Sequence, residues 1–176
     1  VQFKDQEDIY KDEKAWATVG TGMKRKHNTI TSIYIEPEVL EAHNNKLQKK
    51  YALIAEKEVR VEEFNTENAD IIVTAYGTVA RIVKNVIKLA KKDNINVGLI
   101  RPITLWPFPS EAYVKCAEYA KAFLSVELSA GQMVEDVRLA VNGKKPVYFH
   151  GRTGGMIPTE KEIYDKIKEI LEKLGG

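Results

Sequence analysis

The segment 69–109 reads ADIIVTAYGTVARIVKNVIKLAKKDNINVGLIRPITLWPFP and joins two short apolar runs by a helical pattern. The runs, at 70–76 and 96–101, show little polar alternation, which is typical of strands covered on both faces. Between them, apolar residues recur every three or four positions and basic residues occupy the opposite face, as in an amphipathic helix. This order predicts a right-handed βαβ unit with two parallel strands.

Two further apolar runs, 122–128 and 146–150, extend the same order toward the C-terminus. The four runs begin 26, 26 and 24 residues apart, and a helical pattern follows each of them. Thr78 and Thr159 are expected to cap the first and last of these helices at their N-termini. Strand–helix repeats at this spacing predict an α/β domain of three layers, α/β/α, with helices on both faces of the sheet.

The run 58–64, EVRVEEF, differs from the later runs because Val59 and Val61 alternate with charged residues. Period-two alternation predicts a half-exposed strand at the edge of the sheet. Only about six residues join it to the next run, too few for a crossover helix. The residues therefore predict a five-stranded mixed sheet whose first strand is antiparallel.

A long helical pattern occupies residues 37–57, with Pro37 in its first turn. Residues 1–36 have mixed polarity and show no pattern of a second core. We therefore expect residues 1–57 to form a connecting arm with a long helix and residues 58–176 to form the α/β domain. Because no initiator methionine precedes the charged first residues, we expect a piece of a longer protein.

The composition excludes several classes of protein. Charged residues make up 30% of the 176 residues but balance to a net charge of +2, which gives no case for a nucleic-acid or membrane-surface partner. No apolar run reaches the roughly 18 residues of a membrane span. The single cysteine, Cys116, excludes a disulfide framework and is expected to be a buried thiol in a reducing cytoplasm. Three scattered histidines without ligand spacing predict no metal site.

Ligands of open α/β sheets bind beyond the carboxyl ends of the strands. This chain places five candidate residues there: Gly77, Thr78, Arg101, Glu127 and Arg152. Gly77 and Thr78 could bind an anion at a helix start, but one glycine is too few for a dinucleotide fingerprint, and a tight turn before a capped helix is favoured. Arg101 and Glu127 are expected to form an ion pair between strand ends. The glycine-rich segment after Arg152 lacks the ending of a phosphate loop and is expected to be a flexible turn. No catalytic, cofactor-binding or metal-binding residue is assigned.

The segment LWPFP, residues 105–109, follows the strand that ends in Arg101. Its prolines stop the strand and stiffen the turn. Rigid aromatic side chains beside an arginine favour protein interfaces, so Trp106 and Phe108 are candidate interface residues. The alternative is that both rings cap the core of their own domain.

Several motifs resemble the alpha subunit of 2-oxoacid:ferredoxin oxidoreductases, closest to the 2-ketoisovalerate type. They are RPITLWPFP (101–109), ELSAGQMVEDVRLAV (127–141), GRTGGMIPTEKEI (151–163), GTGMKRKHN (20–28) and HNNKLQKKY (43–51). The last two resemble the segment that joins the first domain of that subunit to its second. The likeness runs from about Trp16 to the end of the chain.

The resemblance extends to the C-terminal domain of transketolase-type thiamine diphosphate enzymes. In those domains a strand ending in Val-Glu precedes a helix led by glycine, as at Glu127 and Gly131. The resemblance implies five strands in the order 1-3-2-4-5 with strand 1 antiparallel, in agreement with the alternation at 58–64. It assigns no catalytic residue to this domain.

The family implies that the complete enzyme oxidatively decarboxylates a 2-oxoacid, attaches the acyl group to coenzyme A and passes electrons through iron–sulfur clusters to ferredoxin. Thiamine diphosphate and Mg²⁺ would lie between a first domain outside this chain and a beta subunit, with gamma- and delta-type subunits as further partners. This fragment is expected to bind none of these cofactors, to be inactive alone and to serve structure and subunit contact. Two alternatives stay open: another thiamine-dependent enzyme of the transketolase or 2-oxoacid dehydrogenase type, and a free-standing small-molecule binding or interaction module.

Overall fold

Five strands and five helices form in the part of the chain that the computed structural model describes, residues 24, 26 and 32–175. The strands are β1 (Val61–Phe64), β2 (Ile71–Thr74), β3 (Val97–Pro102), β4 (Ala122–Glu127) and β5 (Val147–Gly151). The helices are α1 (Pro37–Lys57), α2 (Gly77–Lys92), α3 (Ser110–Cys116), α4 (Met133–Val141) and α5 (Glu160–Lys173). Each of the five runs found in the sequence overlaps one strand, with β3 and β5 each ending one residue beyond their runs, and α1 has the predicted bounds.

The strands form one mixed sheet in the order β1-β3-β2-β4-β5. β1 pairs antiparallel with β3, with Val61 opposite Pro102 and Phe64 opposite Leu99. The other three strand pairs are parallel. The predicted fold class, strand order and antiparallel first strand are therefore confirmed. β1 lies at the edge of the sheet, and its residues are half-buried or exposed, as expected of a half-exposed edge strand.

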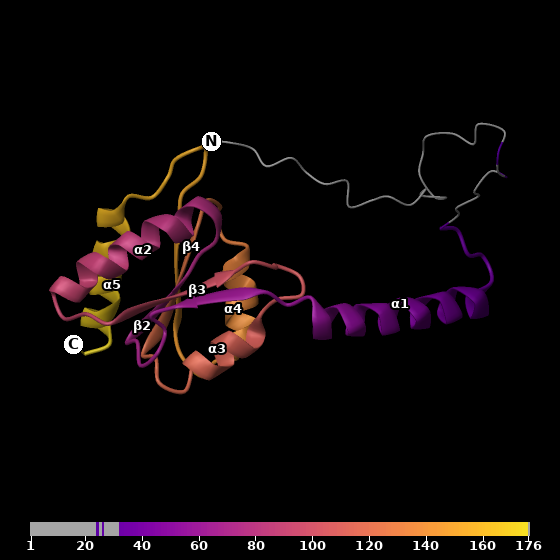
Figure 1. Ribbon diagram of the computed structural model, residues 1–176, viewed down its shortest axis with the longest axis horizontal. Coiled ribbons are helices and arrows are strands. Elements are labelled where there is room, and N and C mark those ends of the chain that lie inside the picture. Colours follow the sequence, from indigo (N-terminus) through magenta and orange to yellow (C-terminus); the bar gives the residue numbers. More distant parts are fainter. Residues whose placement is uncertain (1–23, 25, 27–31, 176) are drawn as a thin grey trace. The chain divides into compact units, whose positions relative to one another are not determined.

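Helices cover both faces of the sheet, which confirms the three predicted layers (Figure 1). α2 and α5 pack on one face over Ile71 and Val73 of β2, whereas α3 and α4 pack on the other face over Ile72. Successive residues of β2 thus enter opposite cores, and all three are fully buried. This two-sided burial is the reason that the strand appears in the sequence as a continuous apolar run.

Of the two predicted helix caps, the one at Thr159 is confirmed and the one at Thr78 is not. Thr159 is the N-cap of α5: its hydroxyl accepts a hydrogen bond from the Glu162 N–H at 3.2 Å, and the Glu162 carboxylate accepts one from the Thr159 N–H at 2.6 Å. The predicted cap at Thr78 is wrong, because α2 begins at Gly77 and Tyr76 takes the N-cap position without a side-chain bond. Gly77 has a φ of 57°, a conformation that glycine adopts without steric cost, and it turns the chain into the helix before Thr78.

The chain divides into two units, Val1–Asn45 and Lys46–Gly176. In the first unit, the ring of Tyr34 stacks on the ring of His43 with centroids 4.5 Å apart. The second unit contains the sheet and the four helices that cover it, and the one thiol, Cys116, is buried there as expected. About half of the expected arm, including most of the motif at 20–28, lies outside the described residues, and the boundary at residue 57 stays a prediction. No helix among the described residues has the length and apolar character to cross a membrane.

Candidate functional site

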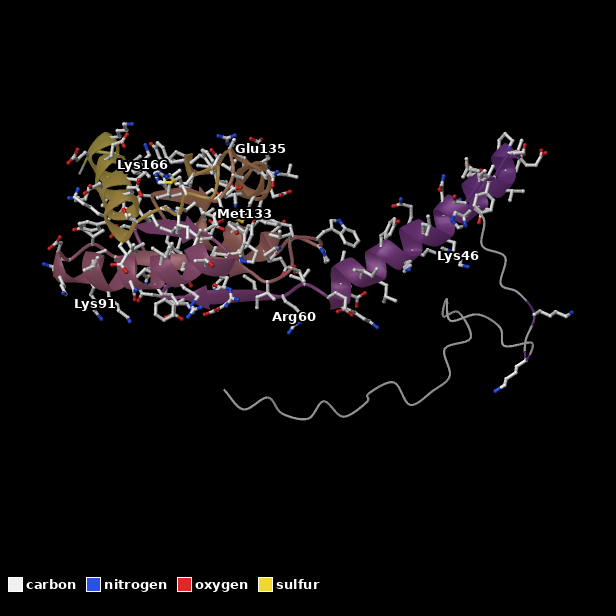
Figure 2. All side chains as sticks on the ribbon, turned by 90° about the horizontal axis from the view of Figure 1, so that it is seen from above. Lys46, Arg60, Lys91, Met133, Glu135 and Lys166 are labelled. Carbon is white, nitrogen blue, oxygen red and sulfur yellow. The ribbon has the colours of Figure 1, made fainter. Side chains whose placement is uncertain are left out.

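The carboxyl ends of the four parallel strands meet at one edge of the sheet, which we call the carboxyl edge. β1 begins at the same edge, because it runs antiparallel to β3. The chain leaves β2 toward the face of α2 and leaves β4 toward the face of α4, so the winding reverses between these two neighbouring strands. In Figure 2, Arg60, which precedes β1, marks the carboxyl edge of the domain. Lys91, in the last turn of α2, marks the opposite end of the domain.

Glu127 ends β4 at this reversal point, and hydrogen-bond donors surround its carboxylate. The residue is only 2% exposed. The hydroxyls of Ser125 and Ser129 donate to the carboxylate at 2.9 Å, one to each oxygen. Three backbone N–H groups at the start of α4 also donate to it at 2.9–3.0 Å, those of Gln132, Met133 and Val134.

The Glu127 carboxylate therefore takes the place that a bound anion would have at the N-terminus of α4. Burial alone would raise the pKa of this carboxyl, but the Gln132 N–H and the two serine hydroxyls outweigh burial and hold the pKa below its ordinary value of 4.5. The Glu127 carboxylate thus occupies the position at which nucleotide-binding α/β sheets hold a phosphate group. The described residues also contain no group of three potential metal ligands. The carboxyl edge as described does not fit a metal–diphosphate group.

Gly131 and Arg152 complete this cluster through their backbones. The Arg152 N–H donates to the Glu127 carbonyl at 3.0 Å, which holds the end of β5 beside the end of β4. Gly131 has a φ of 111° and donates its N–H to the Ser129 hydroxyl at 3.1 Å. The Arg152 guanidinium pairs with Glu162 of α5 at 3.0 Å. Hydrogen bonds from the N-cap residue of α5, Thr159, hold the pKa of Glu162 below its ordinary value.

Gly77 and Thr78 lie across the reversal point, at the start of α2, and both are exposed. This helix start has no side-chain cap, in contrast to the start of α4. Its free N–H groups give it a positive partial charge. A helix N-terminus without a converging side chain is not by itself a binding site, so these two residues remain candidates for contact with a partner.

The expected ion pair between Arg101 and Glu127 is wrong. β2 lies between β3 and β4, so the two strand ends are not neighbours. Arg101 instead pairs with Glu62 of β1 at 2.8 Å, and the same carboxylate accepts a hydrogen bond from Lys84 of α2. The hydrogen bonds from Lys84 and Arg101 lower the pKa of Glu62. Arg101 therefore ties the edge strand to its neighbours and does not face Glu127.

The turn after β3 is fixed to the start of β1 by backbone hydrogen bonds. The Arg60 carbonyl accepts them from the N–H groups of Ile103 and Thr104, at 3.0 and 3.1 Å. The Arg60 N–H donates to the Thr104 hydroxyl at 3.0 Å. These contacts hold the following aromatic residues in a defined position at the carboxyl edge.

The two aromatic candidates of this turn have different surroundings. Trp106 is 61% exposed, and its ring meets the Tyr51 ring edge-on with centroids 5.6 Å apart. Phe108 is half-buried and stacks on the buried ring of Tyr113, with centroids 5.1 Å apart. Trp106 thus offers most of its ring to solvent, whereas Phe108 packs against the core beneath α3.

This difference predicts opposite results for two substitutions. Trp106→Ser is expected to change the free energy of unfolding by less than about 0.5 kcal/mol, as exposed sites do. Phe108→Ser is expected to lower it by about 2 kcal/mol, roughly half the cost of truncating a fully buried phenylalanine. Urea unfolding of both variants measures the difference. A fall as large for Trp106→Ser as for Phe108→Ser would assign the tryptophan ring to the core.

Exposed apolar side chains gather along the carboxyl edge, and every loop that leaves a parallel strand contributes at least one. They are Tyr76 after β2, Ile103, Leu105 and Trp106 after β3, Leu128 after β4, and Met156 and Ile157 after β5. Exposed apolar surface that is shared by several loops is typical of protein interfaces. The charged groups of Glu127, Arg101 and Arg152 at the same edge are engaged in contacts within the domain, whereas two buried nitrogens, Arg101 Nε and His150 Nε2, have no hydrogen-bond partner among the described residues.

Three residues that take part in the contacts of this edge are not among the predicted site residues: Glu62, Ser125 and Ser129. Ser125 and Glu127 occupy alternate positions of β4 and therefore point to the same side of the strand, a signal that the sequence carries, whereas Ser129 lies two positions beyond the end of β4. Glu62 carries no such signal, because its partners Lys84 and Arg101 are 22 and 39 positions away.

The comparison with curated proteins finds relatives along nearly the whole chain. The ketoisovalerate oxidoreductase subunit VorB of Methanothermobacter marburgensis is 41% identical over 170 residues, which are 97% of this chain and 48% of that protein. The chain thus spans about half the length of the curated relatives it matches.

Solved structures share the fold at lower identity. A 2-oxoglutarate:ferredoxin oxidoreductase from Magnetococcus marinus matches with a TM-score of 0.67 and 21% identity, over 77% of this chain and 24% of that one. A split-gene transketolase matches with a TM-score of 0.55 and 17% identity, over 64% of this chain and 41% of that one. The fold is therefore that of the transketolase-like domain.

The comparison with family models finds a match that covers the four parallel strands and the helices between them. The model describes the pyruvate:ferredoxin oxidoreductase core domain II, and it matches residues 69–163, more than half of the chain. The matched segment begins just before β2 and ends within α5. The chain therefore belongs to the family of the pyruvate:ferredoxin oxidoreductase core domain II.

Proposed function

We propose that this chain supplies the C-terminal domain of the alpha subunit of a thiamine diphosphate-dependent 2-oxoacid:ferredoxin oxidoreductase of the 2-ketoisovalerate type. The observation that carries the proposal is the 41% identity to a ketoisovalerate oxidoreductase subunit along 97% of the chain. The complete enzyme would oxidatively decarboxylate the 2-oxoacid, form acyl-coenzyme A and reduce ferredoxin. A cytoplasmic location is part of the proposal, since one buried thiol offers no disulfide framework.

The domain itself would hold subunits together and would not perform the chemistry. The charged groups of the carboxyl edge support this role, because Glu127, Arg152 and Arg101 are each engaged in contacts within the domain. The apolar side chains of the same edge remain exposed. Thiamine diphosphate, Mg²⁺, iron–sulfur clusters and coenzyme A would bind elsewhere in the complex, on the other half of this subunit and on beta-, gamma- and delta-type subunits.

The test is to produce the full-length subunit together with the other subunits encoded beside it, under anaerobic conditions. We expect reduction of ferredoxin that depends on both 2-oxoisovalerate and coenzyme A, with release of carbon dioxide. The rate with 2-oxoisovalerate should exceed the rates with 2-oxoglutarate and pyruvate.

Two results would contradict the proposal in different ways. A faster rate with 2-oxoglutarate or pyruvate would retain the reaction and change the substrate. Ketol transfer between sugars without ferredoxin reduction would instead indicate an enzyme of the transketolase type.

A further inference from the structure

A groove follows the edge strand β1 on the side of the sheet that α3 covers only in part. It consists of a cavity of about 510 Å³ between the last turn of α1, β1 and the first turn of α3, and a neighbouring cavity of about 440 Å³. Glu63 and Lys115 line both cavities, so the two cavities adjoin. We call this feature the β1 groove. It exists because α3 has only seven residues and leaves part of β1 uncovered.

The floor of the β1 groove is apolar. Val59, two positions before β1, and Val61, the first residue of β1, both line it. Phe108 and Ala112 line the opposite side. Val59 is 39% exposed, and Val61 is only partly covered by the core that it contacts. An apolar side chain of a partner could therefore be buried here.

The rim of the β1 groove is acidic. Glu56 and Glu111 are exposed, and neither carboxylate has an ion pair or hydrogen bond among the described residues. Glu63 meets only the Thr66 hydroxyl at 3.2 Å and the exposed Lys115 ammonium at 3.4 Å. With Glu67, which lines the second cavity, four carboxylates thus face one lysine, although the whole chain has a net charge of +2.

We propose that the β1 groove receives a basic segment of another subunit of the same oxidoreductase, with an apolar side chain on the floor and lysine or arginine side chains against the rim. This inference rests on the proposed function, because it takes the partner from the same complex. Charge complementarity favours such a segment. A symmetric contact between two copies of this chain would place one acidic rim against the other and is disfavoured.

Cross-linking identifies the occupant directly. A carbodiimide joins a carboxylate to an amine within contact distance, so the assembled complex is treated and its peptides are analysed by mass spectrometry. We expect Glu56, Glu63 or Glu111 to be joined to lysines of a different subunit. Glu172 of α5, exposed and without an ion pair among the described residues, is the control for non-specific coupling.

Two variants of the full-length subunit test the contributions of rim and floor. The double variant Glu56→Gln and Glu111→Gln should weaken association with the other subunits by about two- to twenty-fold at low salt, and the difference should vanish at high salt. Val59→Lys should weaken association with the other subunits further, because the substitution places an ammonium group on the apolar floor. Matched controls are Glu172→Gln for charge and Leu139→Lys on α4 for an exposed apolar side chain, 79% accessible. Both controls should associate like the wild type.

The outcomes separate this inference from the proposed function. If the wild-type subunits assemble and reduce ferredoxin while both groove variants associate normally, the inference fails and the function stands. Cross-links from the rim only to a second copy of this chain would also overturn it. If the wild-type chain captures no other subunit, both statements are overturned. Thermal unfolding of each variant must match the wild type, so that lost association is not lost folding.

Discussion

Replacing Glu127 with alanine is expected to lower the free energy of unfolding by at least about 3 kcal/mol. The change removes the acceptor for three backbone N–H groups and two serine hydroxyls in a buried place. A buried donor that loses its partner costs about 1–3 kcal/mol, so the three N–H groups alone account for this loss. Urea unfolding of the wild type and the variant measures it.

Two variants sharpen this test. Glu127→Gln keeps the size and one acceptor oxygen, so we expect a smaller loss than with alanine. Glu135→Ala removes an exposed carboxylate of the first turn of α4, whose pair with Arg138 is worth at most about 1 kcal/mol. A loss for Glu127→Ala as small as that for Glu135→Ala would show that water replaces the carboxylate and that the network is not what secures α4.

The same carboxylate makes stability depend on pH. Its pKa is lower in the folded chain than the ordinary value of 4.5, so the unfolded chain binds a proton more readily. Stability from Glu127 is therefore complete above about pH 4.5 and is lost as the pH falls through the lowered pKa. Acid unfolding of Glu127→Gln should show a smaller dependence on pH in this range than the wild type.

Gly151→Ala is expected to lower the free energy of unfolding by about 3 kcal/mol, the upper end of the usual cost of overpacking. A β-carbon at this position would lie 2.3 Å from the Ser129 carbonyl oxygen and 2.4 Å from Cζ of Phe149. The phenyl ring could move, but the carbonyl belongs to the backbone that leads from β4 into α4. The methyl group of the introduced alanine must therefore push the end of β5 away from the end of β4.

The neighbouring exposed residue provides a control. Thr153→Ala lies two positions further along the same segment and should change the free energy of unfolding by less than about 0.5 kcal/mol. If Gly151→Ala were as stable as this control, the approach of β5 to Ser129 would not be needed for the fold, and the Arg152 N–H would hold the strand end by itself.

The sequence by itself determined where the helices and strands lie and that the fold is of the α/β class. Two-sided burial leaves continuous apolar runs such as 70–76, and one-sided exposure leaves the alternation of Val59 and Val61. Both signals depend on neighbouring positions only. Thr159 could be identified as a cap for the same reason, because its partner Glu162 is three residues away. The family motifs added the strand order.

The candidate site depended on contacts that are distant in the chain, and only the tertiary structure decided them. Arg101 finds Glu62 and not Glu127 because β2 separates β3 from β4. Trp106 and Phe108 share one turn, yet only Phe108 reaches the ring of Tyr113. Local sequence cannot distinguish these partners, because burial and ion pairing are set by which strands become neighbours and which helix covers each face.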